Sequence, residues 1–295
     1  MQVILITGAS DGIGAEMARL WAMQRKGDVA LVLAARGIDK LEAVAQACRA
    51  TGAKVLVQRC DVGVQSDCVA LVDAAIRAFG HIDILVNNAG VSAHARFEEV
   101  TDLSWYETLM RINHWGSVWC THAALPHLKA SRGRIVAVAS LAGLVGVPGR
   151  TAYSGSKFAM VGFFESLRTE LFGTGVSVTI AYPGVVATKI RYRGFNAQGQ
   201  PSGKSGLDET ADPIHVTCRT EVGRALLQDF EDLRARRGFH WCAVSRKCRR
   251  HPLYSRRAEG RARHSTRTRV SSLPSAGPRG RRVRAMRGDA SRFSA

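Results

Sequence analysis

Acidic and aromatic residues are scarce in this chain, and it has no long apolar run. Its 295 residues include 24 Asp and Glu against 42 Lys and Arg, which gives a formal net charge of +18, and only 7% are aromatic. No segment is long and apolar enough to cross a bilayer, and no positively charged leader precedes an apolar stretch. We therefore expect a soluble, cytoplasmic protein without an integral membrane segment.

The cysteines lack any regular spacing. There are seven, an odd number, and we predict buried thiols in a reducing compartment rather than a disulfide framework. His240, Cys242, Cys248 and His251 are potential ligands, but their spacing matches no common zinc module. We predict no metal site.

Positive charge is concentrated at the C-terminus. Residues 211–295 hold 21 of the 42 Lys and Arg but only 7 of the 24 Asp and Glu. From Ser245 onward apolar residues are scarce and no helical or alternating period survives, so this segment cannot form a packed core. Three interpretations stay open for residues 245–295: a shifted reading frame in a GC-rich gene, a natural disordered extension, or a tether to nucleic acid or an anionic membrane.

The first 200 residues alternate short apolar runs with longer segments of helical period. The apolar runs cover residues 3–7, 29–33, 55–57, 82–86, 135–139 and 176–181, and helical segments include 41–50, 69–79 and 158–172. Continuous apolar strands separated by helices predict a parallel sheet covered on both faces. We predict a single doubly wound α/β domain over residues 1–244, closed by a helix at 221–237 and a strand at 239–244, with a disordered tail at 245–295.

A glycine-rich turn follows the first apolar run. Gly8, Gly12 and Gly14 are spaced as Gly-x-x-x-Gly-x-Gly, which departs from the general Gly-x-Gly-x-x-Gly dinucleotide fingerprint. Such a turn lets the backbone approach a pyrophosphate, and the N–H groups of the next helix face the phosphates. An ordinary strand-to-helix turn is the alternative.

A tyrosine and a lysine stand four residues apart further along the chain. On a helix this spacing places Tyr153 and Lys157 on one face, and Ser140 lies thirteen residues upstream of Tyr153. A phenol has a pKa near 10, and a nearby cation lowers it. The pair therefore predicts an acid/base device.

These motifs follow the order typical of one enzyme family. Thr7–Gly14 matches Thr-Gly-x-x-x-Gly-x-Gly, Asn87–Gly90 matches Asn-Asn-Ala-Gly, and Asn113, Ser140, Tyr153-x-x-x-Lys157 and Pro183-Gly184 come next. The chain resembles the classical short-chain dehydrogenase/reductase family, which has a Rossmann-type fold. Residues 134–206 look most similar to its branch of steroid-type and lipophilic-alcohol dehydrogenases.

The resemblance, together with the chemistry of hydride transfer, implies roles for four residues. Tyr153 would donate a proton to a ketone or act as a phenolate base toward an alcohol, and Ser140 would orient the carbonyl. Lys157 would lower the pKa of Tyr153 and bind the nicotinamide ribose. Asn113 would hold a water that links Lys157 to solvent, although an Asn inside a helix can also serve only packing or local hydrogen bonding.

The end of the second strand favours NADP(H) over NAD(H). It carries no carboxylate to bind a ribose 2′-hydroxyl, and Arg36 suits a 2′-phosphate. Two details oppose this: Asp11 stands where NADP-preferring relatives often have a basic residue, and Arg36 could be a solvated cation. The predicted cofactor residues are Thr7, Gly8, Ser10, Gly12, Ile13, Gly14, Arg36, Asp61, Val62, Asn88, Ala89, Gly90, Tyr153, Lys157, Pro183, Gly184, Val186 and Thr188.

The glycine-rich segment of about residues 185–210 predicts a mobile substrate lid. Candidate walls for an apolar small-molecule substrate are His94, Phe97, Leu144, Val145, Tyr192 and Phe195, each of which could instead serve ordinary packing. Trp105, Trp115 and Trp119 fit a core or a subunit interface better than a ligand cage. The resemblance implies a homodimer or homotetramer.

Two functions are therefore predicted. The first is an NADP(H)-dependent oxidoreductase that interconverts a secondary alcohol and a ketone or aldehyde. The alternative is a catalytically weak nucleotide-sensing or nucleic-acid-associated protein that uses the basic tail. Such proteins usually lack the catalytic tyrosine, so the presence of Tyr153 favours the enzyme.

Overall fold

The computed structural model describes residues 1–203 and 241–243, all within one compact unit, Met1–Ser255. Its strands are β1 (Gln2–Thr7), β2 (Val29–Ala35), β3 (Lys54–Arg59), β4 (Ile84–Asn87), β5 (Arg134–Val138), β6 (Ser177–Tyr182) and β7 (Trp241–Ala243). Its helices are α1 (Gly12–Arg25), α2 (Ile38–Arg49), α3 (Gln65–Phe79), α4 (Ser104–Met110), α5 (Gly116–Ser131) and α6 (Thr151–Glu170). Short 3-10 turns occur at η1 (Phe97–Glu99) and η3 (Leu141–Gly143), and η2 (Arg111–Trp115) is a π-helical turn.

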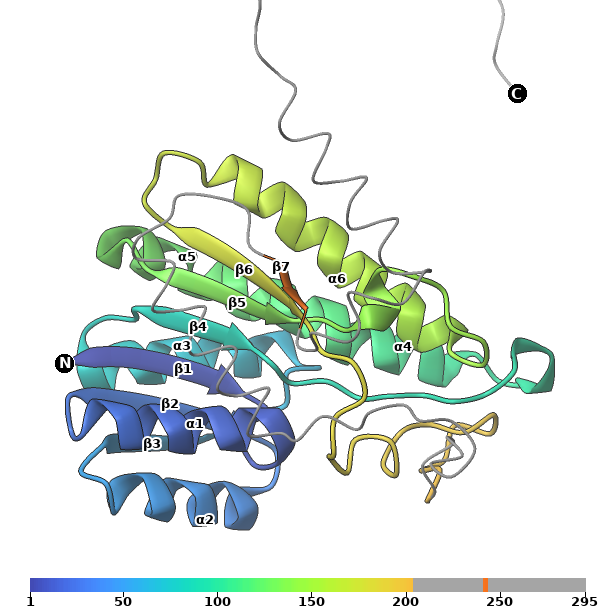
Figure 1. Ribbon diagram of the computed structural model, residues 1–295, viewed down its shortest axis with the longest axis horizontal. Helices are drawn as coiled ribbons and strands as arrows, with labels where there is room; N and C mark the ends of the chain where they lie inside the picture. The colour runs from blue at the N-terminus through green and yellow to red at the C-terminus, as the bar shows by residue number, and fades with distance from the viewer. Residues whose placement is uncertain (204–240, 244–295) are drawn as a thin grey trace, which may run out of the picture. The chain divides into compact units, whose positions relative to one another are not determined.

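The strands form one parallel sheet in the order β3-β2-β1-β4-β5-β6-β7 (Figure 1). Strand β1 pairs on one side with β2, up to Thr7 opposite Ala34, and on the other side with β4, where Ile4 lies opposite Ile84. The chain moves outward from β1 to β3, then returns to β4 and continues in the opposite direction. Ligands of such sheets bind at the carboxyl ends of the strands that flank this switch point.

Apolar side chains cover both faces of the sheet. One cluster joins Ile4 and Leu31 to α1 and α2, and the other joins Leu5 and Ile135 to α3, α5 and α6. Successive side chains of a strand point to opposite faces, so β1 must be apolar throughout to serve both clusters. The predicted doubly wound α/β fold is confirmed. None of the described helices is long and apolar enough to span a membrane.

The two edges of the sheet differ from its centre. Strand β3 is exposed at both ends and only half-buried between them, because it has a neighbour on one side only. At the other edge, β7 pairs with β6 and confirms a strand inside the predicted range 239–244. The predicted helix at 221–237, the lid from residue 204 onward and the tail at 245–295 lie outside the described residues. The domain boundary at residue 244 stays a prediction.

Four cysteines within the described part of the chain are free and buried: Cys48, Cys60, Cys68 and Cys120. A hydrogen bond with Cys68, together with burial, raises the pKa of the Cys60 thiol. Burial raises the pKa of Cys48 to about 11. Such thiols are weak nucleophiles, so their contribution is to packing.

Candidate functional site

The glycine turn after β1 begins the site, at the switch point of the sheet. Gly8 and Gly12 have φ angles of 67° and 58°, a backbone region that favours glycine. Asp11 caps α1, because its Oδ1 accepts a hydrogen bond of 2.7 Å from the Gly12 N–H. The turn therefore presents the amino end of α1 at the carboxyl end of β1, an arrangement suited to bind phosphate groups.

Close packing makes glycine necessary at position 14 as well. A Cβ atom there would lie 2.5 Å from both Asn88 Nδ2 and the Gly8 carbonyl oxygen. Asn88 Nδ2 donates hydrogen bonds to the carbonyl oxygens of Thr7 at 2.9 Å and Gly8 at 3.2 Å. A dinucleotide fits these residues, since the turn is held open and free of side chains where a pyrophosphate has to approach the backbone.

Thr7 connects β1 to the segment that follows β4. Its hydroxyl donates to the Val86 carbonyl at 3.2 Å and accepts from the N–H groups of Asn88 at 3.0 Å and Ala89 at 3.1 Å. The side chain is 2% exposed. Thr7 thus holds Asn88 to Gly90 beside the glycine turn. We call the surface formed by these two segments the cofactor groove, because a nucleotide is expected to bind there.

Two charged residues follow the carboxyl ends of β2 and β3, the strands next to β1 in the sheet. Arg36 Nη1 lies 4.0 Å from Asp61 Oδ2, and the Arg36 side chain is 63% exposed. Asp61 is held by two hydrogen bonds: its Oδ1 accepts from the Gly63 N–H, and its own N–H donates to Asp67 Oδ2. An exposed guanidinium beside a fixed carboxylate is free to contact a further anion.

Ser140 and Tyr153 meet at the carboxyl end of β5. Ser140 caps η3, with its Oγ accepting a hydrogen bond of 3.2 Å from the Ala142 N–H, and it also hydrogen bonds with the Tyr153 phenol. Tyr153 is half-buried. Burial raises the pKa of Tyr153 above its ordinary value, and the Ser140 hydrogen bond and the Arg150 guanidinium partly offset this rise.

Lys157 lies one helical turn after Tyr153 on α6 and is 3% exposed. Its Nζ donates to the Val138 carbonyl at 2.9 Å, lies 3.7 Å from Met160 Sδ and lies 6.0 Å from the centroid of the Tyr153 ring. Burial lowers the pKa of the Lys157 ammonium to about 8. The group is therefore charged at neutral pH and loses its charge in mildly alkaline solution.

One sequence-based expectation differs from the structure. We expected the Lys157 cation to lower the pKa of Tyr153, whereas in the structure that pKa is raised and Lys157 is not among the groups that act on it. The reason is positional: Lys157 donates to the backbone of β5, and desolvation of the phenol outweighs the stabilisation by nearby cations.

Asn113 lies in the π-helical turn between α4 and α5 and is completely buried. Its side-chain amide forms two hydrogen bonds with the backbone of Val91, at 2.8 and 2.9 Å, and donates to Ser156 Oγ at 3.0 Å. A Cβ atom at Gly90 would lie 3.1 Å from Asn113 Oδ1 and 3.6 Å from Lys157 Nζ. Asn113 therefore joins the nucleotide groove to the lysine, and π-helical turns are frequent at functional sites.

Burial of Lys157 should cost stability in a pH-dependent way. The penalty is fully present below the folded pKa of about 8 and disappears as pH rises past the unfolded value of 10.5. We expect Lys157→Met to be more stable than the parent at pH 7, and this advantage should shrink by about 2 kcal/mol between pH 7 and pH 9.5.

Urea unfolding of both proteins at the two pH values measures this difference, and effects of the other titrating groups cancel between parent and variant. A constant difference across the range would mean that Lys157 keeps an ordinary pKa in the folded protein.

The segment after β6 returns to the glycine turn. The Pro183 carbonyl accepts from the Leu141 N–H at 3.1 Å, and a Cβ at Gly12 would lie 3.2 Å from Thr188 Cγ2. Arg193 Nη2 pairs with Asp11 Oδ2 at 2.6 Å. Although burial alone would raise it, the pKa of Asp11 is lowered by the Gly12 hydrogen bond and the Arg193 guanidinium. The described part of the predicted lid is thus attached to the cofactor groove.

The candidate pocket residues differ in their surroundings. Phe195 packs against Trp105, with ring centroids 5.7 Å apart, and Leu144 packs against the core below η3. Phe97 is 61% exposed and Tyr192 43% exposed. His94 lies beside Gly149, and Val145 is half-buried between η3 and α6. Leu144 and Val145 follow Ser140 by four and five residues, after the turn η3, and are the pocket candidates nearest to it in sequence.

The structure brings the four predicted catalytic residues together. Most of the predicted cofactor residues lie at the carboxyl ends of β1, β2, β3, β4 and β6 or in the loops after them, including Ser10, Val62, Gly184 and Val186. Gly12, Ile13 and Gly14 lie in the first turn of α1, and Tyr153 and Lys157 lie on α6. Sequence reasoning missed Ser156, Arg193 and Arg150. Only Arg150 left a signal, because positions 150, 153 and 157 share one helical face.

Two other predictions concern tryptophans and metals. Trp105 is 4% exposed and belongs to a small cluster with Phe195, while Trp115 is 47% exposed and stacks on Trp119. Trp105 is therefore a core residue. Within residues 1–203, no group of three or more His, Cys, Asp or Glu side chains lies together as metal ligands would.

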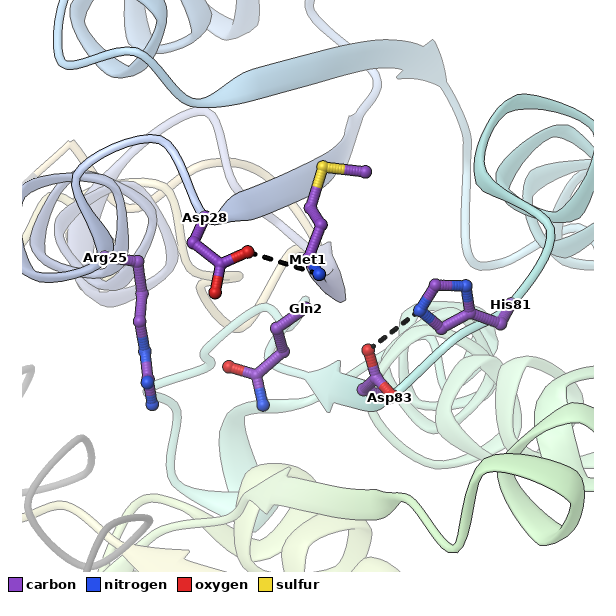
Figure 2. A pocket seen from close by; sticks show the side chains of 6 residues that line it. All are labelled: Met1, Gln2, Arg25, Asp28, His81 and Asp83. Carbon is purple, nitrogen blue, oxygen red and sulfur yellow. Dashed lines mark ion pairs between the residues drawn. The ribbon is translucent and has the colours of Figure 1, made fainter.

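Figure 2 shows a separate hollow at the amino ends of the strands. It is lined by Met1, Gln2, Arg25, Asp28, His81 and Asp83. The N-terminal ammonium lies 3.2 Å from Asp28, and His81 Nε2 lies 3.2 Å from Asp83. These residues precede or begin β1, β2 and β4, so the hollow lies at the amino ends of the strands, away from the site.

Comparison with known proteins agrees with this geometry. The chain is 45% identical over 186 residues to an 11-beta-hydroxysteroid dehydrogenase-like 4A of Arabidopsis thaliana, covering 63% of this chain and 61% of the relative. It is 41% identical over 229 residues to an 11-beta-hydroxysteroid dehydrogenase of Pinus massoniana, covering 77% and 63%. The chain thus spans about three fifths of the length of these curated relatives.

A solved structure, an alcohol dehydrogenase from the archaeon Thermococcus sibiricus complexed with 5-hydroxy-NADP, matches with a TM-score of 0.65 and 25% identity, covering 78% of this chain and 91% of that one. The family model described as short chain dehydrogenase matches residues 2–198. Because that match takes in the glycine turn, Asn113, Ser140, Tyr153 and Lys157, the chain belongs to the short-chain dehydrogenase family.

Proposed function

We propose that this chain is an NADP(H)-dependent oxidoreductase that interconverts a secondary alcohol and a ketone or aldehyde. The observation that carries the proposal is the convergence of Ser140, Tyr153 and Lys157 beside the groove of the glycine turn. The Ser140–Tyr153 hydrogen bond and the short approach of Lys157 to Gly90 bring a proton donor next to the cofactor groove.

The roles of the side chains follow from the charge that develops on the substrate. The nicotinamide cofactor, when bound, supplies or accepts the hydride. Ser140 Oγ orients the substrate oxygen, and Tyr153 donates a proton to that oxygen in reduction or removes one in oxidation. Because burial keeps the pKa of Tyr153 high, the phenol is protonated at neutral pH and ready to act as the acid. Reduction is therefore the direction that this ionisation state serves.

Lys157 and Asn113 assist the proton transfer without donating the proton. The Lys157 ammonium is charged at neutral pH and directs its Nζ toward the groove near Gly90, where it can hold a ribose hydroxyl. Asn113 bonds with Val91 and Ser156 and thereby fixes the floor of the groove. Both residues act on positioning and charge, and neither is the proton donor itself.

The preference for NADP(H) rests on Arg36. This side chain is exposed at the carboxyl end of β2, and Asp61 lies beside it. Asp11, the residue that opposed the preference, is held in an ion pair with Arg193 and caps α1, so it has a structural role. The matched archaeal dehydrogenase was solved with 5-hydroxy-NADP, which supports the same choice.

We expect Arg36→Ala to weaken NADPH binding by about 1.5–3 kcal/mol, roughly 10- to 100-fold, because a charge-assisted contact with the 2′-phosphate is lost. NADH binding should change by less than about threefold, since NADH carries no phosphate there. Fluorescence titration with both cofactors measures the two dissociation constants. Arg77→Ala removes the same charge from an exposed residue in the last turn of α3, which precedes the amino end of β4, and is the control. An equal loss of affinity for NADPH and NADH would show that Arg36 does not bind the 2′-phosphate.

We further propose an apolar substrate. The plant relatives are named for 11-beta-hydroxysteroids, and Leu144 and Val145 give the segment after Ser140 an apolar surface. The cytoplasmic location, the dimer or tetramer and the exact ketone stay predictions.

A panel of steroid and long-chain ketones with NADPH and NADH, followed by loss of cofactor absorbance, tests the proposed function. Turnover of at least one ketone with NADPH is the expected result. Tight NADPH binding without turnover of any ketone or alcohol would instead favour the nucleotide-sensing alternative.

A further inference from the structure

Arg150 lies at the start of α6 on the same helical face as Tyr153 and Lys157. It occupies the N-cap position, three residues before the tyrosine and seven before the lysine. Its Cζ lies 5.8 Å from the centroid of the Tyr153 ring, and Lys157 Nζ lies 6.0 Å from the same centroid. The phenol ring therefore has two cations at nearly equal distance.

The loop after β4 holds the Arg150 guanidinium in this place. Arg150 Nη1 donates to Ser92 Oγ at 2.9 Å, with a longer contact of 3.5 Å to the Ala93 carbonyl. Ser92 is itself 4% exposed. The Ala95 N–H donates to the Gly149 carbonyl at 2.9 Å and fixes the backbone beside Arg150. The guanidinium is thus positioned by a second segment of the chain, unlike a solvated surface cation.

Of the two ionisable groups that act on Arg150, only the Tyr153 phenol can become an anion. Burial lowers the pKa of Arg150, the charge of Tyr153 raises it, and the Arg191 guanidinium lowers it. None of the ion pairs formed among residues 1–203 includes Arg150. A partly buried cation that faces another cation is stabilised when a neighbouring group ionises to an anion.

We propose that Arg150 is a positioning residue that stabilises the phenolate form of Tyr153, the base required for alcohol oxidation. The inference rests on the proposed function.

The charge of Arg150 matters most in alkaline solution, where alcohol oxidation is favoured. The Lys157 ammonium, with a pKa of about 8, loses its charge there, whereas a guanidinium keeps it. Arg150 is the cation that acts on the phenol, and it keeps its charge above pH 8. The polar and charged groups around this unit are Ser140 after β5, Lys157 on α6, Arg191 after β6, and His94 beside Gly149.

The test follows the ionisation of Tyr153 directly. The protein is labelled with 13C at tyrosine Cζ, saturated with NADP+, and titrated from pH 6 to pH 10.5 by NMR. Tyr153→Phe identifies the resonance among the five tyrosines of the chain. Arg150→Gln removes the charge but keeps a donor for Ser92, and Arg150→Lys keeps the charge. Arg168→Gln, near the end of α6, is the matched control.

We expect Arg150→Gln to raise the Tyr153 pKa by about one unit, a tenfold loss of phenolate at a given pH, and Arg150→Lys to raise it by less than half as much. The pH profile of alcohol oxidation should move by the same amount, and Arg168→Gln should match the parent. Identical titrations of the parent and Arg150→Gln would overturn the proposal, as would a parent phenol that stays protonated throughout. Because the resonance reports ionisation without turnover, a failure of the proposed function would appear in the rate assay alone.

Discussion

Tyr153→Phe should lower the rate of ketone reduction by at least 100-fold, while the dissociation constant for NADPH changes by less than about twofold. The ring that packs on α6 remains, and only the hydroxyl that hydrogen bonds with Ser140 is lost. A positioned proton donor contributes a factor of about 10² to 10⁴ to such a step. Single-turnover absorbance changes give the rate, and fluorescence titration gives the dissociation constant.

Tyr106→Phe is the matched control for this substitution. The Tyr106 hydroxyl lies 2.7 Å from Thr151 Oγ1, at the first residue of the same helix, so the variant also removes one phenolic hydrogen bond. Its rate should stay within about threefold of the parent, since the hydroxyl hydrogen bonds to Thr151 rather than to Ser140. A Tyr153→Phe protein that keeps activity within tenfold of the parent would exclude Tyr153 as the catalytic acid.

The sheet could be predicted because its central strands are continuous apolar runs in the sequence. Strands β1, β2 and β4 are buried on both faces, so continuous apolar runs were needed and were visible. The edge strand β3 is longer than its short apolar run, since Lys54 and Arg59 at its ends face solvent and leave no apolar signal. Pairing with a neighbour, and not its own composition, determines where such a strand ends.

The candidate site was predictable only as far as local motifs reach. The spacing of Tyr153 and Lys157 predicts a shared helical face, which α6 confirms. The spacing of two residues does not show how deeply their side chains are buried. The pKa of Tyr153 is raised because the phenol is desolvated in the folded chain. The π-helical turn at Asn113 depends on Val91 and Ser156, both more than twenty residues away. Contacts of that range cannot be read from a single sequence.

The same limit explains why Arg150 was missed and Arg36 was found. Arg36 follows a strand directly, so its place at the sheet edge follows from the order of elements. Arg150 becomes relevant only when Ser92, 58 residues earlier, holds its guanidinium toward the Tyr153 ring. A helical face shared with Tyr153 is a hint of this role, but many helices carry a cation at that spacing by chance.

Gly14→Ala should damage cofactor binding more than any other single methyl group added to this chain. The new Cβ would lie 2.5 Å from the Gly8 carbonyl oxygen and from Asn88 Nδ2, well inside contact distance. Both are fixed, because Asn88 Nδ2 bonds to the carbonyls of Thr7 and Gly8. The turn must therefore move away from α1, and overpacking of this kind costs about 1–3 kcal/mol of stability.

We expect the dissociation constant for NADPH to rise by at least 100-fold, since the displaced turn no longer presents the amino end of α1 to the pyrophosphate. Gly162→Ala is the matched control: it adds the same methyl group inside helix α6, where a Cβ meets nothing within 4 Å. That variant should bind NADPH like the parent and be more stable by up to about 1 kcal/mol, because alanine is the better helix former. Fluorescence titration and urea unfolding of both variants separate binding from stability. A folded Gly14→Ala protein with unchanged NADPH affinity would show that the glycine turn does not hold the cofactor.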